Sequence, residues 1–240
     1  MLKTMIFIDY ENFDISRKKY YNNEFNAKPP KIDFHKFAKL LIDKINNNLE
    51  LVKVLVFAPK PVTKLQAIPY YANRYKWLTS LNEEEYITLV EGTHRVKPTY
   101  GYTKDTIDIH NRRTYTIEEK GTDVNLATHL ATKGFMNAYD VAIVISGDTD
   151  YLPIISILNT IGKIVIVVGI KNQKLDAFYG CTDKQMWLDR DFFNECLAEN
   201  VTDDLNDDII EGNADCIDQE EETDENVSGT ELKDKAKTED

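Results

Sequence analysis

Short apolar runs alternate with amphipathic stretches along the first 200 residues of the chain. Runs rich in Val, Ile and Leu predict strands at residues 3–10, 51–58, 86–91, 140–146, 163–169 and 185–188. Apolar residues at helical spacing predict helices at residues 33–46, 66–81, 123–135, 151–160 and 189–197. Strands that are apolar along their whole length are covered on both faces. We therefore expect a mainly parallel central sheet sandwiched by helices, a Rossmann-like three-layer α/β fold.

Two segments fall outside this alternation. Residues 93–119 are polar and rich in tyrosine and basic residues, which predicts a loop or hairpin insertion within a domain that spans residues 1–200. Residues 203–240 contain no aromatic residue and few large apolar ones, so they cannot bury enough surface to offset the entropy lost on ordering. We expect a disordered acidic tail there.

The acidity of the chain is concentrated in this tail. The net charge is −12, but residues 203–240 carry 16 acidic residues against 3 lysines, which leaves the remaining 202 residues at +1. The overall negative charge therefore does not argue against a nucleic-acid partner. Three interpretations of the tail stay open: a solubilising terminus, an electrostatic competitor for a basic groove, or a binding segment for a protein partner.

Several protein classes are disfavoured by the composition. The longest apolar runs, residues 141–145 and 164–170, are far shorter than the roughly 20 residues of a membrane span, and the first residues lack a signal-peptide cleavage site. The three cysteines have no CxxC spacing, which disfavours both a disulfide framework and a cysteine zinc site. We expect a cytoplasmic protein with no membrane partner.

Carboxylates lie at the ends of two predicted strands and at the start of one helix. Asp9 ends the first strand, Asp148 and Asp150 follow the fourth strand, and Asp123 begins the third helix. Because the carboxyl ends of parallel strands meet at one edge of a sheet, we expect these side chains to converge. Converging carboxylates repel one another unless a cation lies among them, and oxygen ligands suit Mg²⁺ or Mn²⁺. Each aspartate taken singly can also be read as a helix N-cap.

An acidic metal site of this kind acts on phosphates, because the ion neutralises the phosphodiester and activates a water. The sequence has no GxxxxGK[ST] or GxGxxG phosphate loop, which argues against ordinary NTPases and dinucleotide enzymes. A haloacid dehalogenase-type phosphatase needs a second Asp two residues after the first, where this chain has Glu11. A receiver-type phospho-acceptor fits less well still, because Lys163 and Lys171 flank a late strand instead of ending it.

Three segments resemble the NYN domain family, a branch of the PIN-like nucleases. IFIDYENF (residues 6–13) resembles the opening strand of the family, which ends in Asp with an Asn three residues later. EKGTDVNLATHLA (residues 119–131) is similar to its Lys-Gly-x-Asp-Val helix start. DVAIVISGDTDYLPIISILNTIGKIVIVVG (residues 140–169) contains its Ser-Gly-Asp-x-Asp-x-x-Pro signature. The resemblance extends over residues 3–197.

The resemblance implies a PIN-like fold and divalent-metal-dependent endoribonuclease activity. It would make Asp9, Asp123, Asp148 and Asp150 the catalytic, metal-binding carboxylates, with Mg²⁺ or Mn²⁺ as cofactor. The expected substrate is RNA.

The resemblance also implies roles for nearby polar residues. Asn12 would orient the metal or the phosphate, and Ser146 and Thr149 would support the substrate side of the site by hydrogen bonding. One residue departs from the family pattern: His129 stands where many members of this branch carry an Asp, six residues after Asp123. This departure leaves a second hypothesis open, a catalytically weak or inactive RNA-binding regulatory protein on the same fold.

Basic and aromatic residues of the 93–119 insertion and its flank suggest where RNA would lie. The basic candidates are Lys97, Lys104, Arg112, Arg113 and Lys120, and the interleaved aromatic candidates are Tyr100, Tyr102, His110 and Tyr115. Cationic groups with aromatic stackers are typical of grooves that bind single-stranded nucleic acid. Acidic residues in the same segment weaken this pattern, so a plain solvated insertion is the alternative.

Overall fold

A seven-stranded sheet forms the centre of the protein, with the strand order β4-β3-β2-β1-β5-β6-β7. The computed structural model describes residues 1–198; the predicted tail at 203–240 lies outside the described residues. The strands are β1 (Leu2–Asp9), β2 (Leu49–Lys60), β3 (Ile87–Pro98), β4 (Tyr115–Lys120), β5 (Val141–Ile145), β6 (Ile164–Ile170) and β7 (Lys184–Leu188). Every neighbouring pair is parallel except β3 and β4, so the expected mainly parallel α/β sheet is confirmed.

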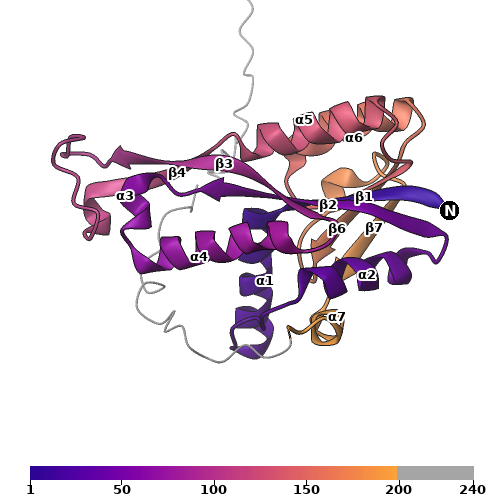
Figure 1. Cartoon of the computed structure of the whole chain (residues 1–240), viewed down its shortest axis with the longest axis horizontal. Coiled ribbons are helices and arrows are strands. Elements are labelled where there is room, and N and C mark those ends of the chain that lie inside the picture. Colours follow the sequence, from indigo (N-terminus) through magenta and orange to yellow (C-terminus); the bar gives the residue numbers. More distant parts are fainter. Residues whose placement is uncertain (199–240) are drawn as a thin grey trace, which may run out of the picture. The chain divides into compact units, whose positions relative to one another are not determined.

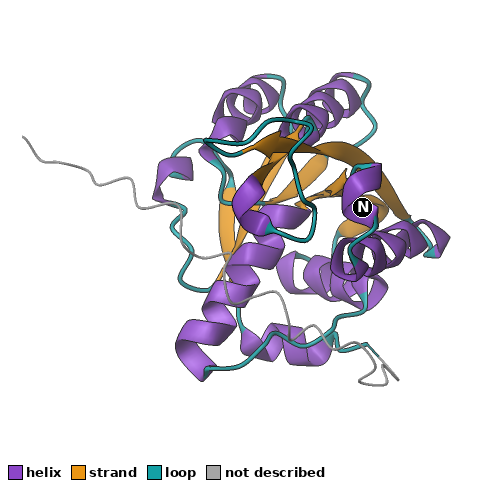
Figure 2. Ribbon diagram, turned by 90° about the vertical axis from the view of Figure 1, so that its left-hand side faces the viewer, coloured by secondary structure: helices purple, strands orange, loops and turns teal. Residues whose placement is uncertain are grey.

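Helices cover both faces of this sheet (Figure 1). They are α1 (Tyr10–Phe25), α2 (Phe34–Ile45), α3 (Thr63–Gln66), α4 (Pro69–Ser80), α5 (Thr122–Phe135), α6 (Leu152–Thr160) and α7 (Arg190–Glu195). One core cluster joins α1, α2, α7 and the end of α4 to the sheet, and a second joins α5 and α6 to the opposite face. Figure 2 shows the sheet enclosed between helices, as the three-layer expectation requires.

Strand β2 is longer than its sequence predicts. Pro59 and Pro61 were expected to end it near residue 58, but the strand runs through Pro59 to Lys60. The pairing with β1 ends at Phe57, while Pro59 pairs with Gly92 of β3. Proline is tolerated where a strand lacks a neighbour on one side, because no ladder hydrogen bond is lost there.

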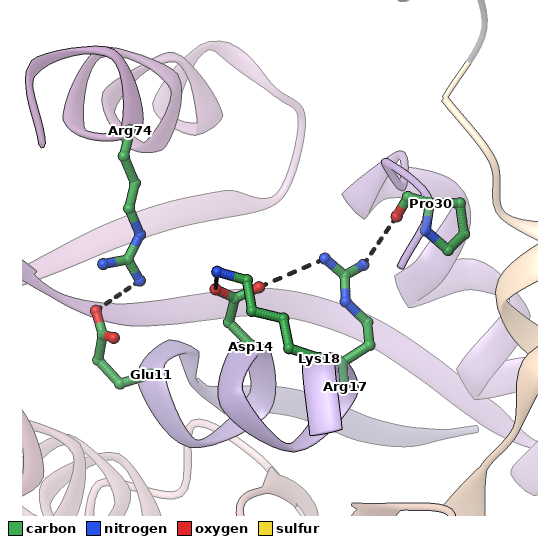
Figure 3. Close-up of polar contacts among 6 residues, drawn as sticks. All are labelled: Glu11, Asp14, Arg17, Lys18, Pro30 and Arg74. Carbon is green, nitrogen blue, oxygen red and sulfur yellow. Dashed lines mark hydrogen bonds and ion pairs between the residues drawn. The ribbon is translucent and has the colours of Figure 1, made fainter. Parts of the chain in front are cut away.

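Helix α1 has no counterpart among the predicted elements. Its buried face includes Asp14 and Arg17, whose side chains form an ion pair at 3.6 Å, so the hydrophobic period is interrupted by charge. Arg17 also donates a hydrogen bond to the carbonyl of Pro30 (Figure 3). Its guanidinium packs over the ring of Phe13. These contacts give both terminal nitrogens of the buried Arg17 guanidinium a partner and leave only its Nε without one, which explains how a helix without a clear apolar stripe packs against the sheet.

The helix predicted at residues 66–81 begins only at Pro69, as α4, and its predicted first residue, Gln66, instead ends the separate short helix α3. Pro69 occupies the first turn of α4, and a residue before proline avoids helical geometry, so the break falls at Ala67 and Ile68. No helix among the described residues is both long and apolar enough to cross a membrane.

Residues 93–120 form a projection that we call the arm. The outer half of β3 pairs in antiparallel register with β4, from Thr93 opposite Lys120 to Pro98 opposite Tyr115. A separate small core of Leu65, Ile68 and Tyr115 packs the arm against α3 and the start of α4 (Figure 1). The arm is therefore a packed hairpin.

Candidate metal centre

The site lies where the order of the strands reverses. β1 pairs with β2 on one side and with β5 on the other, so the chain builds the sheet outward from β1 in both directions. Such a switch point opens a crevice beyond the carboxyl ends of the strands. Ile8 pairs with Ile145, so Asp9 and Ser146, the next residue on each strand, meet at this crevice.

Asp9 is buried and held by three hydrogen bonds. As the N-cap of α1, its Oδ1 accepts from the backbone N–H of Asn12 at 3.2 Å. Its Oδ2 accepts from Ser146 Oγ at 2.9 Å and from the Tyr151 hydroxyl at 3.2 Å. Burial nevertheless raises the pKa of Asp9 to about 6, because these donors only partly offset the lost hydration. The carboxylate is therefore poised for a further positive partner.

The hydroxyl of Tyr151 contacts two carboxylates at once. It lies 3.2 Å from Asp9 Oδ2 and 3.1 Å from Asp123 Oδ1. A phenol carries one hydrogen, so the two carboxylates share a single donor. Tyr151 therefore ties the end of β1 to the start of α5, and it leaves negative charge uncompensated between them.

The position of Asp123 depends on two glycines. Gly121, with φ of 85°, is the N-cap of α5, so Asp123 lies in the first turn and is not itself the cap. A methyl group added to Gly92 of β3 would lie 2.0 Å from Thr122 Oγ1. Only glycine at position 92 lets the start of α5 come this close to the sheet, which brings Asp123 to the edge.

The loop after β5 supplies Asp148. Its backbone N–H donates to Ser146 Oγ at 3.1 Å, and its side chain accepts from the backbone N–H of Asp150 at 2.9 Å. Asp148 is thus the N-cap of a short 3-10 turn at Thr149–Tyr151. A capping carboxylate keeps a second oxygen, so this role is compatible with metal binding. Thr149 and the side chain of Asp150 are exposed at the same turn.

Three carboxylates converge at this edge. One oxygen each of Asp9, Asp123 and Asp148 lies within 4.8 Å of the others, and we call this group the acidic edge. Asp150 does not belong to the group. Three hard oxygen ligands, one of them desolvated, match the ligand preference of Mg²⁺ or Mn²⁺, which usually keep several waters. The acidic edge can bind a divalent metal.

Asn12 and Gln173 hold the loop around this group. The side-chain oxygen of Asn12 accepts from the backbone N–H of Gly147 at 3.0 Å and from Gln173 Nε2 at 2.9 Å. Gln173 Oε1 in turn accepts from the backbone N–H of Ile170 at 3.0 Å. Sequence reasoning did not find Gln173, because it lies in a turn after β6 with no motif around it. Its contacts link the ends of β1, β5 and β6.

Two further acidic residues border the site, and sequence reasoning did not select either as a ligand. Burial, together with the charges of Glu11, Asp9 and Asp123, raises the pKa of Glu119 to about 7. Glu11 is different, because Arg74 of α4 pairs with it at 2.6 Å (Figure 3). The Arg74 guanidinium also lies over the ring of Tyr10. Glu11 is thus already neutralised by the protein.

The cations predicted to bind RNA lie on the arm, and two are paired. Lys97 and Lys120 contact the Glu118 carboxylate at 2.6 Å and 2.8 Å. Arg112 lies over the ring of Tyr115 at 5.0 Å, and Arg113 follows Arg112 on the same exposed turn. The arm therefore offers a mixture of paired and unpaired positive charge, among them Lys104 in its exposed loop.

The predicted aromatic stackers divide into two groups. Tyr100, Tyr102 and His110 are exposed in the loop of the arm. Tyr115 was expected to face RNA, but it is buried in the small core, where its hydroxyl donates to the carbonyl of Ile109 at 2.9 Å. A buried ring has no free face for a base, so the sequence pattern misplaced Tyr115.

His129 does not belong to the carboxylate group. It lies on α5 beyond Asp123 and packs edge-on against Phe57, with ring centroids 5.7 Å apart. Partial burial and the nearby charge of Lys133 lower the pKa of His129. It is a neutral packing residue of the α5 face at neutral pH.

Three comparisons with known proteins bear on the family of the chain. No curated protein matches the chain. A crystal structure of a protein of unknown function, VPA0982 from Vibrio parahaemolyticus RIMD 2210633, is similar over 80% of this chain and 95% of that one, with 16% sequence identity and a TM-score of 0.48. A profile of the NYN domain matches residues 3–188, which include the end of β1, the start of α5 and the loop after β5, the three segments that carry the acidic edge. The chain therefore belongs to the NYN domain family.

Proposed function

We propose that this protein is an endoribonuclease that uses Mg²⁺ or Mn²⁺ to hydrolyse RNA phosphodiesters. One observation supports this more than any other. Carboxylates from β1, from α5 and from the loop after β5 lie within 4.8 Å of one another at a topological switch point, in a chain of the NYN family. No nucleophilic side chain is needed for such a reaction, since water is the nucleophile.

Asp9, Asp123 and Asp148 would hold the metal. When bound, the ion supplies neutralisation of the phosphodiester and a water of lowered pKa. Ser146 and Tyr151 hold Asp9 in place through its Oδ2. We assign Asp150 a role toward the substrate side, since it is exposed at the turn that Asp148 caps.

The other proposed substrate contacts extend from this edge onto the arm. Asn12, Ser146 and Thr149 lie beside the carboxylates, and Asn12 keeps its amide donors for a phosphate. Lys97, Arg112, Arg113 and Lys120 would guide the backbone of a single strand, with Tyr100 and Tyr102 as base stackers. Lys97 and Lys120 would exchange Glu118 for phosphate.

The test is cleavage of a labelled single-stranded RNA with Mn²⁺ or Mg²⁺, with EDTA as the metal-free control. Asp148→Asn is the informative variant, because asparagine preserves the N-cap oxygen and removes the charge. Asp105→Asn, in the exposed loop of the arm, is the matched control. We expect cutting by the wild type and by Asp105→Asn, and none by Asp148→Asn or in EDTA.

Retained RNA binding with no cutting under any metal would contradict the nuclease proposal. It would favour the RNA-binding regulatory alternative, and His129→Asp would then test whether the departure from the family pattern is responsible. A protein that neither binds nor cuts RNA would exclude both functions.

A further inference from the structure

The outer surface of α5 and α6 differs from that of the other helices. α6 contains no charged residue, and the exposed positions of α5 after its first turn are Thr128, Thr132 and Phe135, with the one charged residue there, Lys133, half-buried. By contrast, α1 and α2 expose lysines and acids along their outer faces. A helix face that contacts only water normally carries charge, so this uncharged face calls for an explanation.

Five large apolar side chains gather at the carboxyl end of this helix pair. Phe135 is 61% exposed, Met136 80%, Ile157 47%, Ile161 41% and Ile164 37%. We call them the α5–α6 patch. They come from α5, from α6 and from the first residue of β6.

The carboxyl ends of α5 and α6 lie side by side. A methyl group added to Gly134 of α5 would lie 2.5 Å from Leu158 of α6, so the two helices touch beside Phe135. The ammonium of Lys163, after α6, bonds the side chain of Asn137, after α5. The five apolar side chains thus surround one contact and do not lie scattered.

The polar groups of this face do not need an outside partner. Thr132 Oγ1 donates to the carbonyl of Thr128 at 2.7 Å, and Thr160 Oγ1 donates to the carbonyl of Ser156 at 3.0 Å. Removing water from the face therefore leaves these donors satisfied. A charged partner would gain nothing here, whereas an equally uncharged, apolar partner would fit.

We infer that the α5–α6 patch is the interface of a homodimer. The patch presents on the order of 500 Å² of apolar surface, about the size of the largest apolar patch on a typical soluble monomer, which is often functional. In a two-fold contact each copy offers the same surface, so an uncharged patch is its own complement. Two copies would remove about 1,000 Å² from water, which is below the roughly 1,200 Å² of stable interfaces and falls in the range of weak, transient ones. We expect a dimer that dissociates on dilution.

A dimer formed through the α5–α6 patch leaves the acidic edge open. α5 and α6 begin at the carboxyl edge of the sheet, next to Asp123 and Asp150, and end at the opposite edge. The patch lies at their far ends, so a partner seated there does not need to cover the metal site. The inference is therefore independent of the proposed nuclease activity.

Sedimentation velocity of the full 240-residue chain, from about 1 to 100 μM, tests the inference. We expect a concentration-dependent shift from a 27.7 kDa monomer to a dimer. The double variant Phe135→Glu/Ile161→Glu should stay monomeric throughout. Tyr179→Glu, at an exposed aromatic outside the patch, should dimerise like the wild type.

Met136→Lys is a second variant, which tests the patch even if the double variant does not fold. Met136 follows α5 and is largely exposed, so lysine there should fold normally and weaken the dimer at least about ten-fold. Circular dichroism and melting curves check that each variant is folded. A wild-type chain that stays monomeric over the whole range, or patch variants that dimerise unchanged, would overturn the inference.

Discussion

Two carboxylates of this protein have pKa values displaced in opposite directions. Asp9, at the acidic edge, is buried without a cation, and its pKa is raised to about 6. Glu118, on the arm, is solvent-accessible and held between Lys120 and Lys97, which lower its pKa to about 2. The acidic edge thus lacks the positive charge that the arm already contains.

The acidic edge is a site that can receive a cation, whereas the arm already pairs its carboxylate with its own lysines. Desolvation penalises the charged form of Asp9, and the protein accepts that penalty without supplying a partner. A bound metal would remove the penalty. On the arm, charge pairs are exposed, so each contributes little to stability and can exchange for a ligand.

The largest expected effect is that of Asp9→Asn. A carboxyl whose pKa rises from 3.8 to about 6 on folding makes the native state less stable as pH increases through that interval. Above pH 6 the loss is on the order of 3 kcal/mol. In EDTA at pH 7, Asp9→Asn should therefore raise the free energy of unfolding, by less than about 3 kcal/mol because its amide nitrogen cannot accept from Ser146 and Tyr151, while RNA cleavage falls about a thousand-fold.

Urea denaturation in EDTA at pH 4 and pH 7 measures this effect, which should be small at pH 4. Added Mn²⁺ should stabilise the wild type and not the variant. Glu118→Gln is the matched control, since it removes a carboxylate that its neighbours favour and should not stabilise the protein. An Asp9→Asn chain no more stable than wild type at pH 7 would show that the acidic edge is not strained by charge.

A second prediction compares glycines of the two regions. Gly92→Ala places a methyl group 2.0 Å from Thr122 Oγ1 and should push the start of α5, with Asp123, away from Asp9. Displacement of a reacting group by about 1 Å costs about a hundred-fold in rate. Gly101→Ala, in the arm loop at φ of 85°, meets no atom within 4 Å and should cost only about 1 kcal/mol of backbone strain.

Cleavage rates and melting temperatures of both glycine variants provide the measurement. Gly92→Ala should lose activity out of proportion to stability, and Gly101→Ala should keep its activity. Equal activity in the two variants would mean that the approach of α5 to β3 does not position Asp123.

A third prediction concerns the shared phenol. Tyr151→Phe removes the donor between Asp9 and Asp123, so the two carboxylates should separate and Mn²⁺ affinity should fall about ten-fold, or roughly 1.4 kcal/mol. Titration calorimetry with Mn²⁺ measures it. Tyr139→Phe is the control. The hydroxyl of Tyr139 also bonds a residue of α5, the carbonyl of Leu130, but away from the acidic edge. Unchanged affinity in Tyr151→Phe would assign Tyr151 to packing alone.

The smallest expected effect belongs to the arm. Glu118→Gln should release Lys97 and Lys120 and tighten RNA binding a few-fold at low salt, with a steeper salt dependence. Fluorescence anisotropy of a labelled single strand in EDTA measures it without cleavage. Weaker or unchanged binding would place the RNA elsewhere than on these two lysines.

The regular part of the fold was predictable because its signal is local. Continuous apolar runs indicated the buried strands, and all seven strands but β4 have predicted counterparts. Helix α1 was missed for a physical reason: its buried face contains Asp14 and Arg17, and the pairing that makes their burial acceptable is tertiary. The helix predicted over residues 66–81 was wrong across Pro69, where α4 begins, and the strand end predicted before Pro59 was wrong too, since only the ends of neighbouring strands decide whether an N–H is needed.

The sequence by itself determined which residues could form the acidic edge. Positions at strand and helix ends, together with motifs of the NYN family, selected Asp9, Asp123 and Asp148, but they selected Asp150 as well, which lies outside the group. Tertiary structure alone decided how close they come, because the distance depends on Gly92, on the reach of the Tyr151 hydroxyl and on Gln173 from a distant turn. It also decided that Tyr115 is buried and that the α5–α6 patch is exposed. Hydrophobic pattern specifies which faces prefer to be buried, but which of them finds a partner depends on contacts between residues far apart in the chain.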